Sequence, residues 1–169
     1  MRLTPNLAFG GQCEAAFKFY ERCFGGKIVF MLTYGKSPMA EQVPPRWREK
    51  IFHATLTVGD NVLMGSDPVP EQYEQPKGFS VLLGIDDPLD AERIFHALAE
   101  NGTVQMPLQN TFWSVRFGVL VDQFGIPWAI NCEQAPSVAS RRRAQGKRRL
   151  THAVSRTLGT DSDGIRCKL

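Results

Sequence analysis

The order of the predicted secondary structure elements is the same in the two halves of residues 3–131. Each half begins with a short strand, continues through one amphipathic helix and ends in three strands. The two predicted helices, over 14–24 and 89–100, mark equivalent points of the two halves. An internal duplication of this kind predicts two β-α-β-β-β modules, each with one sheet face covered by its own helix. The fold class is therefore α+β, and the uncovered sheet faces are expected to enclose a common cavity.

The element boundaries follow apolar periodicity and the positions of glycine and proline. The strands are expected at 3–9, 27–34, 51–58, 62–66, 79–85, 104–108, 112–121 and 126–131. A proline-containing loop is expected over 35–48, and a polar linker over 68–76 joins the halves. The buried helix positions are predicted to be Ala16, Phe17, Tyr20, Cys23 and Phe24 in the first helix and Ile94, Phe95, Leu98 and Ala99 in the second.

The charge is divided unevenly along the chain. Residues 1–135 hold eleven Lys or Arg against fifteen Asp or Glu, a formal charge of −4, whereas residues 136–169 hold nine against two, a charge of +7. An acidic body argues against nucleic acid as its ligand. The basic segment 136–169 is predicted to be a disordered appendage. Its arginine clusters at 141–143 and 147–149 either remain solvated or contact phosphate or acidic lipid.

The cysteines and the apolar runs bear on location. No two of the four cysteines have the C-x-x-C spacing of a zinc or redox site. The chain start lacks the apolar run of a signal peptide, and no run approaches the roughly 18 apolar residues of a membrane span. We therefore expect a cytoplasmic protein with free thiols and no membrane partner.

Residues 3–131 contain an ordered set of short motifs. They are Leu7-Ala-Phe9 with Gly10, Ala16-Phe-Lys-Phe-Tyr20, Phe24-Gly-Gly26, Ile51-Phe-His-Ala54, Leu63-Met-Gly-Ser-Asp67, Gly102 with Val104, Met106-Pro-Leu-Gln109, Thr111-Phe-Trp113, Phe117-Gly118 and Asp122-x-Phe-Gly-Ile-Pro-Trp128. This set resembles the vicinal oxygen chelate superfamily, which includes glyoxalase I, extradiol dioxygenases and bleomycin-resistance proteins, and in particular its PhnB-like branch. The resemblance implies a PhnB-like domain over 1–135 with a cupped eight-stranded mixed sheet, helices on the outer face, a homodimer, and a ligand inside each cup.

Metal-using members of this superfamily place two His and two Glu ligands on the first, fourth, fifth and eighth strands. Counted from the shared motifs, the matching positions are Pro5, Met64, Ser80 and Ala129. None of them supplies the imidazole or carboxylate that such an ion needs. The resemblance therefore implies that this chain has lost the metal site, and with it the metal-dependent isomerisation and ring cleavage. We expect no cofactor.

His53 is the candidate with the most chemical potential. Strand alternation predicts that it points into the cup, on the face opposite Phe52, Ala54, Leu56 and Val58. There it is either a general base or ligand contact, or a histidine bonded to a neighbouring strand. If a metal were held by relocated ligands instead, His53 and Glu133 would be the candidate donors.

Other residues complete the predicted ligand-binding set. Trp113 either stacks on the ligand or packs in the core, whereas Trp128 is expected to face the helix side. Arg116 either clamps an anionic ligand or pairs with a carboxylate. Asp122 is interpreted as a turn residue that bonds its own backbone. The resemblance implies that Met64 and Ser80, which match family ligand positions, face the cup, and alternation from the matched Ala129 adds Asn131; these are the weakly polar positions of the cup.

The predicted function is metal-independent binding of a small organic molecule, as in the drug-resistance members. The alternative is an enzyme of unknown reaction that uses His53, acting as a lyase, an isomerase or a dioxygenase, with or without relocated metal ligands. PhnB-like proteins often carry a demethylubiquinone methyltransferase label. No glycine-rich loop for S-adenosylmethionine follows a strand here, so that activity is not predicted.

Overall fold

The computed structural model describes residue 1 and residues 3–133 of the chain, and Met1–Glu133 forms one compact unit. The basic segment 136–169 lies outside the described residues.

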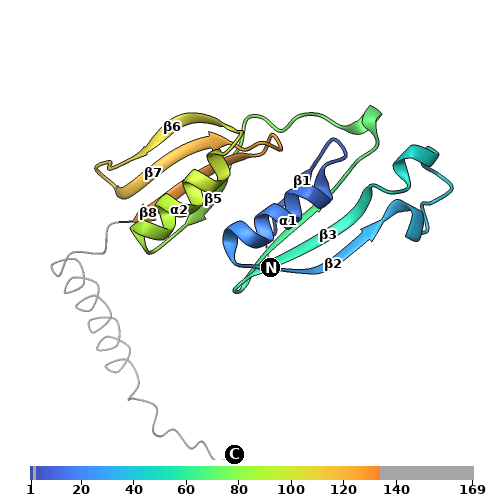
Figure 1. Cartoon of the computed structure of the whole chain (residues 1–169), viewed down its shortest axis with the longest axis horizontal. Helices are drawn as coiled ribbons and strands as arrows, with labels where there is room; N and C mark the ends of the chain where they lie inside the picture. The colour runs from blue at the N-terminus through green and yellow to red at the C-terminus, as the bar shows by residue number, and fades with distance from the viewer. Residues whose placement is uncertain (2, 134–169) are drawn as a thin grey trace, which may run out of the picture. The chain divides into compact units, whose positions relative to one another are not determined.

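Two β-α-β-β-β modules follow one another, and the predicted α+β fold class is confirmed (Figure 1). The first module contains β1 (Asn6–Ala8), α1 (Cys13–Phe24), β2 (Lys27–Thr33), β3 (Ile51–Val58) and β4 (Asn61–Ser66). The second contains β5 (Val81–Gly84), α2 (Pro88–Ala99), β6 (Thr103–Gln109), β7 (Ser114–Val121) and β8 (Pro127–Glu133). Short 3-10 turns lie at η1 (Tyr34–Lys36), η2 (Pro45–Trp47) and η3 (Pro70–Gln72). β1 and β5 are shorter than the strands predicted over 3–9 and 79–85.

The eight strands form two hydrogen-bonded sheets of four with the same internal order, β1-β4-β3-β2 and β5-β8-β7-β6. In each sheet the first strand of the module pairs parallel with the fourth, and the other pairs are antiparallel. The identical order in both sheets is the structural expression of the duplication that the sequence predicts.

Each helix buries one apolar stripe against the sheet of its module. Helix α1 ends at Gly25, whose φ of 67° is the left-handed conformation that glycine adopts readily at this position. Helix α2 begins after Asp87, whose side chain accepts the Leu89 N–H at 2.9 Å as a helix cap. The buried helix residues are Cys13, Ala16, Phe17, Tyr20 and Cys23 in α1 and Ala91, Ile94, Phe95 and Leu98 in α2.

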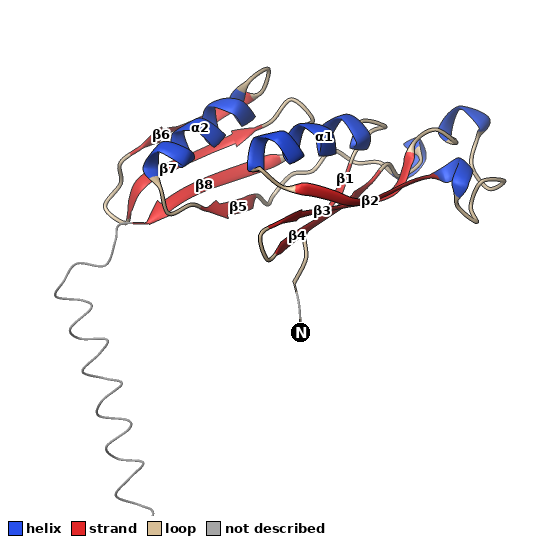
Figure 2. Ribbon diagram, turned by 60° about the horizontal axis from the view of Figure 1, so that its bottom comes forward, coloured by secondary structure: helices blue, strands red, loops and turns tan. Residues whose placement is uncertain are grey.

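Both helices lie on the same side of the two sheets (Figure 2). Helix α1 also reaches the second module, since the rings of Tyr20 and Phe24 pack edge-on against Trp128 of β8 at 5.3 and 5.4 Å. Trp128 is 1% exposed and faces the helices, as strand alternation predicts. Within residues 3–133, no helix covers the opposite face of either sheet, and we call these two surfaces the open faces.

One prediction of side-chain direction at the start of β3 is wrong. Phe52 was expected to be buried with Ala54 and Leu56, but it is 37% exposed, whereas Ile51 is 1% exposed. The register between β2 and β3 shifts at Leu32 and Thr33, so simple alternation does not hold for the first residues of β3.

Gly26 and Gly102 occupy equivalent places in the two modules, directly before β2 and β6, the strands that follow each helix. A Cβ on Gly26 would lie 2.6 Å from the Thr57 carbonyl oxygen, and a Cβ on Gly102 would lie 2.5 Å from that of Val121. Both obstacles are backbone atoms, which cannot rotate away. Each module therefore needs a residue without a side chain where its helix returns to the sheet.

We expect Gly26→Ala and Gly102→Ala each to lower the free energy of unfolding by about 2 kcal/mol, because the added methyl group must displace backbone. The control is Gly84→Ala, where no atom lies within 4 Å of the added Cβ. Urea unfolding of the three variants measures the difference. Equal stability of all three variants would contradict the close contact between these two glycines and the neighbouring backbone.

Candidate functional site

The open face of the first sheet carries a row of mostly uncharged side chains. The strand register sets Asn6 beside Met64, Met64 beside Thr55, and Thr55 beside Phe30. On β4 the neighbouring positions Leu63 and Gly65 are buried toward α1, so Met64 is directed to the open side.

His53 stands next to this row. Its Nε2 lies 3.2 Å from the Thr55 hydroxyl, and its ring centroid lies 5.9 Å from that of Phe30. Ala54 and Leu56 on the same strand are fully buried toward the helix, so His53 is on the open side, as predicted. The second ring nitrogen can donate or accept a further hydrogen bond, according to the tautomer.

The open face of the second sheet is more apolar. Strand register sets Leu82 beside Ala129 and Ala129 beside Val119, and it sets Asn131 beside Phe117. Trp113, which directly precedes β7, packs edge-on against Phe117 with ring centroids 5.6 Å apart.

The loop before β7 ends this face in two exposed aromatic side chains. Phe112 and Trp113 contact each other at 4.4 Å between ring centroids, yet Phe112 is 91% exposed and Trp113 is 47% exposed. Exposed aromatic groups in contact with one another form a surface on which a planar ligand can stack.

Asn131 has an unused polar group. Among the described residues, its Oδ1 is buried and has no hydrogen-bond partner. A buried acceptor without a donor is costly, so a ligand that donates a hydrogen bond there would be favoured. Ser80 is exposed immediately before β5, whereas Asn131 pairs with Gly84 at the other end of that strand.

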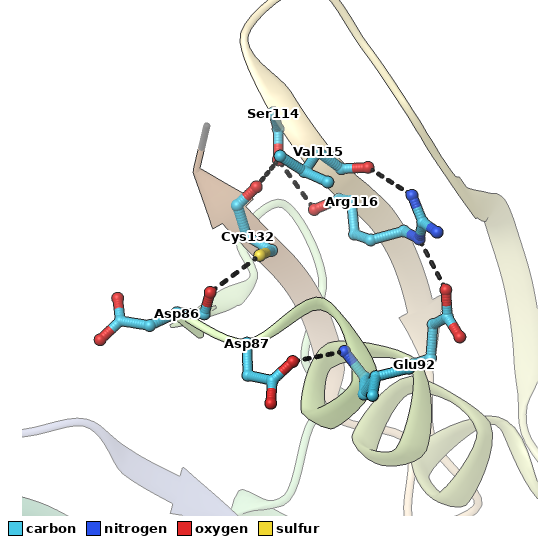
Figure 3. A network of polar contacts seen from close by, with 8 residues as sticks. Asp86, Asp87, Glu92, Ser114, Val115, Arg116 and Cys132 are labelled. Atoms are coloured by element: carbon cyan, nitrogen blue, oxygen red, sulfur yellow. Dashed lines mark hydrogen bonds and ion pairs between the residues drawn. The ribbon is translucent and has the colours of Figure 1, made fainter. Parts of the chain in front are cut away.

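Arg116 is directed away from the open face (Figure 3). Its Nε donates to Glu92 of α2 at 2.7 Å and its Nη1 to the Val115 carbonyl at 2.9 Å. Of the two sequence interpretations, pairing with a carboxylate is the one that this geometry matches. Nearby, the Ser114 hydroxyl donates to the carbonyls of Cys132 and Arg116, at 2.7 and 2.8 Å, so this network holds β7, β8 and α2 together.

The positions that correspond to the superfamily's metal ligands do not fit a metal ion. The Pro5 carbonyl accepts the Met64 N–H at 3.0 Å, which leaves these two residues side by side on the first sheet. Ala129 belongs to β8 of the second sheet, and Ser80 directly precedes β5 of the same sheet. A thioether, a hydroxyl and two side chains without donors are a poor set for a divalent ion. Within residue 1 and residues 3–133, no three or more His, Cys, Asp and Glu side chains gather closely enough to hold one, and His53 and Glu133 lie on different sheets.

Asp122 does more than the sequence interpretation assigned to it. Its Oδ1 accepts the Phe124 and Ile126 N–H groups at 2.9 and 3.0 Å, as a turn residue would. Its Oδ2 also accepts the Tyr20 hydroxyl at 2.5 Å and the Trp128 indole N–H at 2.8 Å. Burial, reinforced by the Asp122 carboxylate, raises the pKa of Tyr20 above its ordinary value. Asp122 therefore joins α1 of the first module to the β7–β8 turn of the second.

Asp67 is a second buried carboxylate to which no role was assigned from the sequence. It is 1% exposed, and it accepts the N–H groups of Cys13 and Ile51, each at 2.9 Å. Its own carbonyl accepts the Trp47 indole N–H at 3.1 Å. Burial raises the pKa of Asp67. The residue connects the end of β4 to the start of α1, the start of β3 and the η2 turn.

Comparison with known proteins covers most of the described chain. The family model of 3-demethylubiquinone-9 3-methyltransferase matches residues 1–131. Protein YjdN of Escherichia coli K12 is 33% identical over 139 residues, which is 78% of this chain and 95% of YjdN. The crystal structure of PA1353 from Pseudomonas aeruginosa is 46% identical with a TM-score of 0.73, over 80% of this chain and 99% of PA1353. A PhnB protein structure from Bacillus cereus is 27% identical with a TM-score of 0.66, over 78% and 99%.

Within the described residues, none of the helices has the length and apolar character that crossing a bilayer requires.

Proposed function

The chain belongs to the 3-demethylubiquinone-9 3-methyltransferase family, the PhnB-like branch of the vicinal oxygen chelate superfamily, and from this membership we propose that it binds a small organic molecule on its open faces without using a metal ion. The observation that carries the proposal is the open surface itself. It combines exposed aromatic rings, one imidazole and one buried acceptor that lacks a donor. Such a mixture of apolar walls and few polar groups is typical of small-molecule sites.

The ligand class that fits these side chains is an uncharged, planar aromatic compound with a hydrogen-bond donor. Trp113 and Phe117 supply ring surfaces, and the buried Asn131 Oδ1 supplies an acceptor once the ligand displaces the side chains that cover it. Arg116, which could have bound an anion, is already paired with Glu92. His53, Met64 and Ser80 contribute weakly polar contacts in this proposal.

Metal independence follows from the donors that are present rather than from any ion observed or missing. Met64 and Ala129 stand where metal-using members carry ligands, and their neighbours in register, Asn6 and Leu82, provide neither imidazole nor carboxylate. The family description names a methyltransferase. We do not extend that activity to this chain, which lacks a G-x-G-x-x-G loop for the methyl donor.

We further propose a cytoplasmic homodimer. Because both helices lie on one side of the sheets, the open faces are directed to the other side, where a second copy can cover them. Exposed apolar residues on this surface, such as Phe30 and Leu82, would be buried in the dimer. Sedimentation equilibrium of the full chain tests this, and a monomer at every concentration would oppose it. Cys13, Cys23 and Cys132 are buried free thiols, which suits a reducing compartment.

A thermal-shift screen of uncharged aromatic compounds tests the ligand class. For a compound that raises the melting temperature, we expect Trp113→Ala and His53→Ala each to weaken binding about tenfold, which corresponds to the loss of one good contact. The change is measured by isothermal titration calorimetry. The matched control is His96→Ala, an exposed histidine on α2.

Unchanged affinity in both open-face variants would contradict the proposed site. Turnover of the same compound, lost in His53→Ala, would favour the alternative in which His53 acts as a general base. The observation behind that alternative is the hydrogen bond between His53 and Thr55, which fixes the imidazole on the open side.

A further inference from the structure

A cleft lies between the two modules, and neither Trp113 nor His53 is among the residues that line it. Its volume is about 670 Å³, within the range of cavities that hold small ligands. The edge strand β5 forms one wall, and the start of β4 with the segment before β1 forms the other. The lining also includes Phe24, Ile94 and Trp128, which come from both helices and from β8.

The polar side chains that line this cleft are those of Thr4, Asp60 and Asn61. Of the described residues that line it, Asp60 alone is charged. Asn61, next to it, donates its amide N–H to the Val58 carbonyl at 3.4 Å, which leaves its side-chain oxygen available. No lysine or arginine is among the described lining residues, so the electrostatic field at the mouth favours a cation.

The free edge of β5 adds backbone groups to the same cleft. Ile85 donates its N–H to Asn131 of β8 at 3.0 Å. Because backbone polar groups alternate between the two edges of a strand, the carbonyls and N–H groups of Leu82 and Gly84 point away from β8. Among the strands that the structure describes, none pairs with β5 on that side, since β5 is at the edge of its sheet.

We propose that this cleft binds a small organic ammonium compound with an apolar body. The body would lie against the apolar walls, and the ammonium group would meet Asp60 and the free carbonyls of β5. The cleft shares Leu82 with the open face of the second sheet, but His53, Trp113 and Asn131 are not among its lining residues, so the proposal does not depend on the open-face ligand.

The test uses the full chain and 2-phenylethylammonium chloride as the probe, with 3-phenylpropionate as a carboxylate of similar size. A ligand of this size is expected to bind with a Kd of about 1 mM, which suits an amide chemical-shift titration. We expect the ammonium probe to shift the amide signals of residues 60–63 and 81–85, with little change at His53 or Phe117. The carboxylate probe should bind at least about threefold more weakly.

Two variants locate the binding. Asp60→Asn should remove most of the preference for the ammonium probe over the carboxylate. Gly84→Phe should abolish binding by filling the cleft, and its backbone should tolerate the change because no atom lies within 4 Å of an added Cβ. An unchanged amide spectrum elsewhere shows that each variant is folded, and Gly84→Ala, which leaves the cleft open, should bind as the natural chain does.

Equal binding of the two probes, or shifts confined to His53, Thr55 and Phe117, would overturn the proposal. So would binding to Gly84→Phe with the affinity of the natural chain. Failure of these tests would leave the open-face site untouched, because Trp113→Ala and His53→Ala report on that site separately.

Discussion

Replacing Asp122 with alanine is expected to lower the free energy of unfolding by about 4 kcal/mol, because the change leaves several buried donors without an acceptor. The Tyr20 hydroxyl, the Trp128 indole N–H and two turn amides all bond this one carboxylate. Tyr20 and Trp128 are 0% and 1% exposed, so water cannot replace the lost partner without opening the core. For a body of this size, the melting temperature should fall by about 12 °C.

The matched control for this variant is Asp60→Ala. Asp60 lies in the turn between the last two strands of the first module, as Asp122 does in the second, but it is exposed. Its replacement should change stability by less than about 0.5 kcal/mol. Tyr20→Phe removes a single hydrogen bond to the carboxylate and should cost about 1.5 kcal/mol. If Asp122→Ala unfolds at the same temperature as Asp60→Ala, then Asp122 does not hold the modules together.

The second large effect is expected at Asp67. Asp67→Ala should lower the free energy of unfolding by about 3 kcal/mol, since the amides of Cys13 and Ile51 lose their acceptor in a buried position. The start of α1 and the start of β3 should both loosen. Hydrogen exchange of the Cys13 and Ile51 amides provides a local readout, and both should become faster relative to those of the β7–β8 pair.

Asp67 should also make stability depend on pH. Burial raises its pKa in the folded protein above the ordinary value of 3.8, so the unfolded chain ionises first as pH rises. The stability contributed by the neutral form is complete below the unfolded pKa and is lost as pH rises through the folded pKa. The stability advantage of the natural chain over Asp67→Asn should therefore shrink as pH rises from below 3.8. The check is the urea midpoint of both proteins, measured from below pH 3.8 upward. An advantage of the natural chain that grows as pH rises would contradict the expected direction.

Much of the fold could be predicted from the sequence, because it rests on local periodicity. The apolar stripes of the two helices and the alternation of β3 correctly indicated which face is buried, as at Ala54, whereas both faces of β8 are buried from Pro127 to Ile130. The orientation of His53 followed from the same alternation. Where a bulge interrupts the register, as between Leu32 and Thr33, the two-residue alternation of a strand no longer predicts which side chains are buried, as at Phe52.

The contacts that join distant parts of the chain could not be predicted in this way. Asp122 and Tyr20 are 102 residues apart, and Asp67 and Cys13 are 54 residues apart. A buried carboxylate does not appear in a pattern of apolar residues, and a turn aspartate looks the same whether its second oxygen is free or bonded. One signal was present in the sequence. Buried Tyr and Trp side chains need polar partners, and the sequence analysis had assigned none to Tyr20 or to Trp128.

The partner of Arg116 remained open in the sequence for a related reason. Pairing with a carboxylate and binding of an anionic ligand were both compatible with a strand arginine, and the register shift between Ser114 and Arg116 obscures which face the side chain takes. Only the position of Glu92 on α2 decides it, at 2.7 Å from the guanidinium.

The most direct measurement is the affinity of the strongest screen compound for the full chain, determined by calorimetric titration before and after exhaustive treatment with a chelator. Binding that depends only on the aromatic, imidazole and amide groups of the open faces should keep its Kd within about twofold after treatment. Affinity that disappears with the chelator and returns on addition of zinc, nickel or manganese would contradict metal-independent binding.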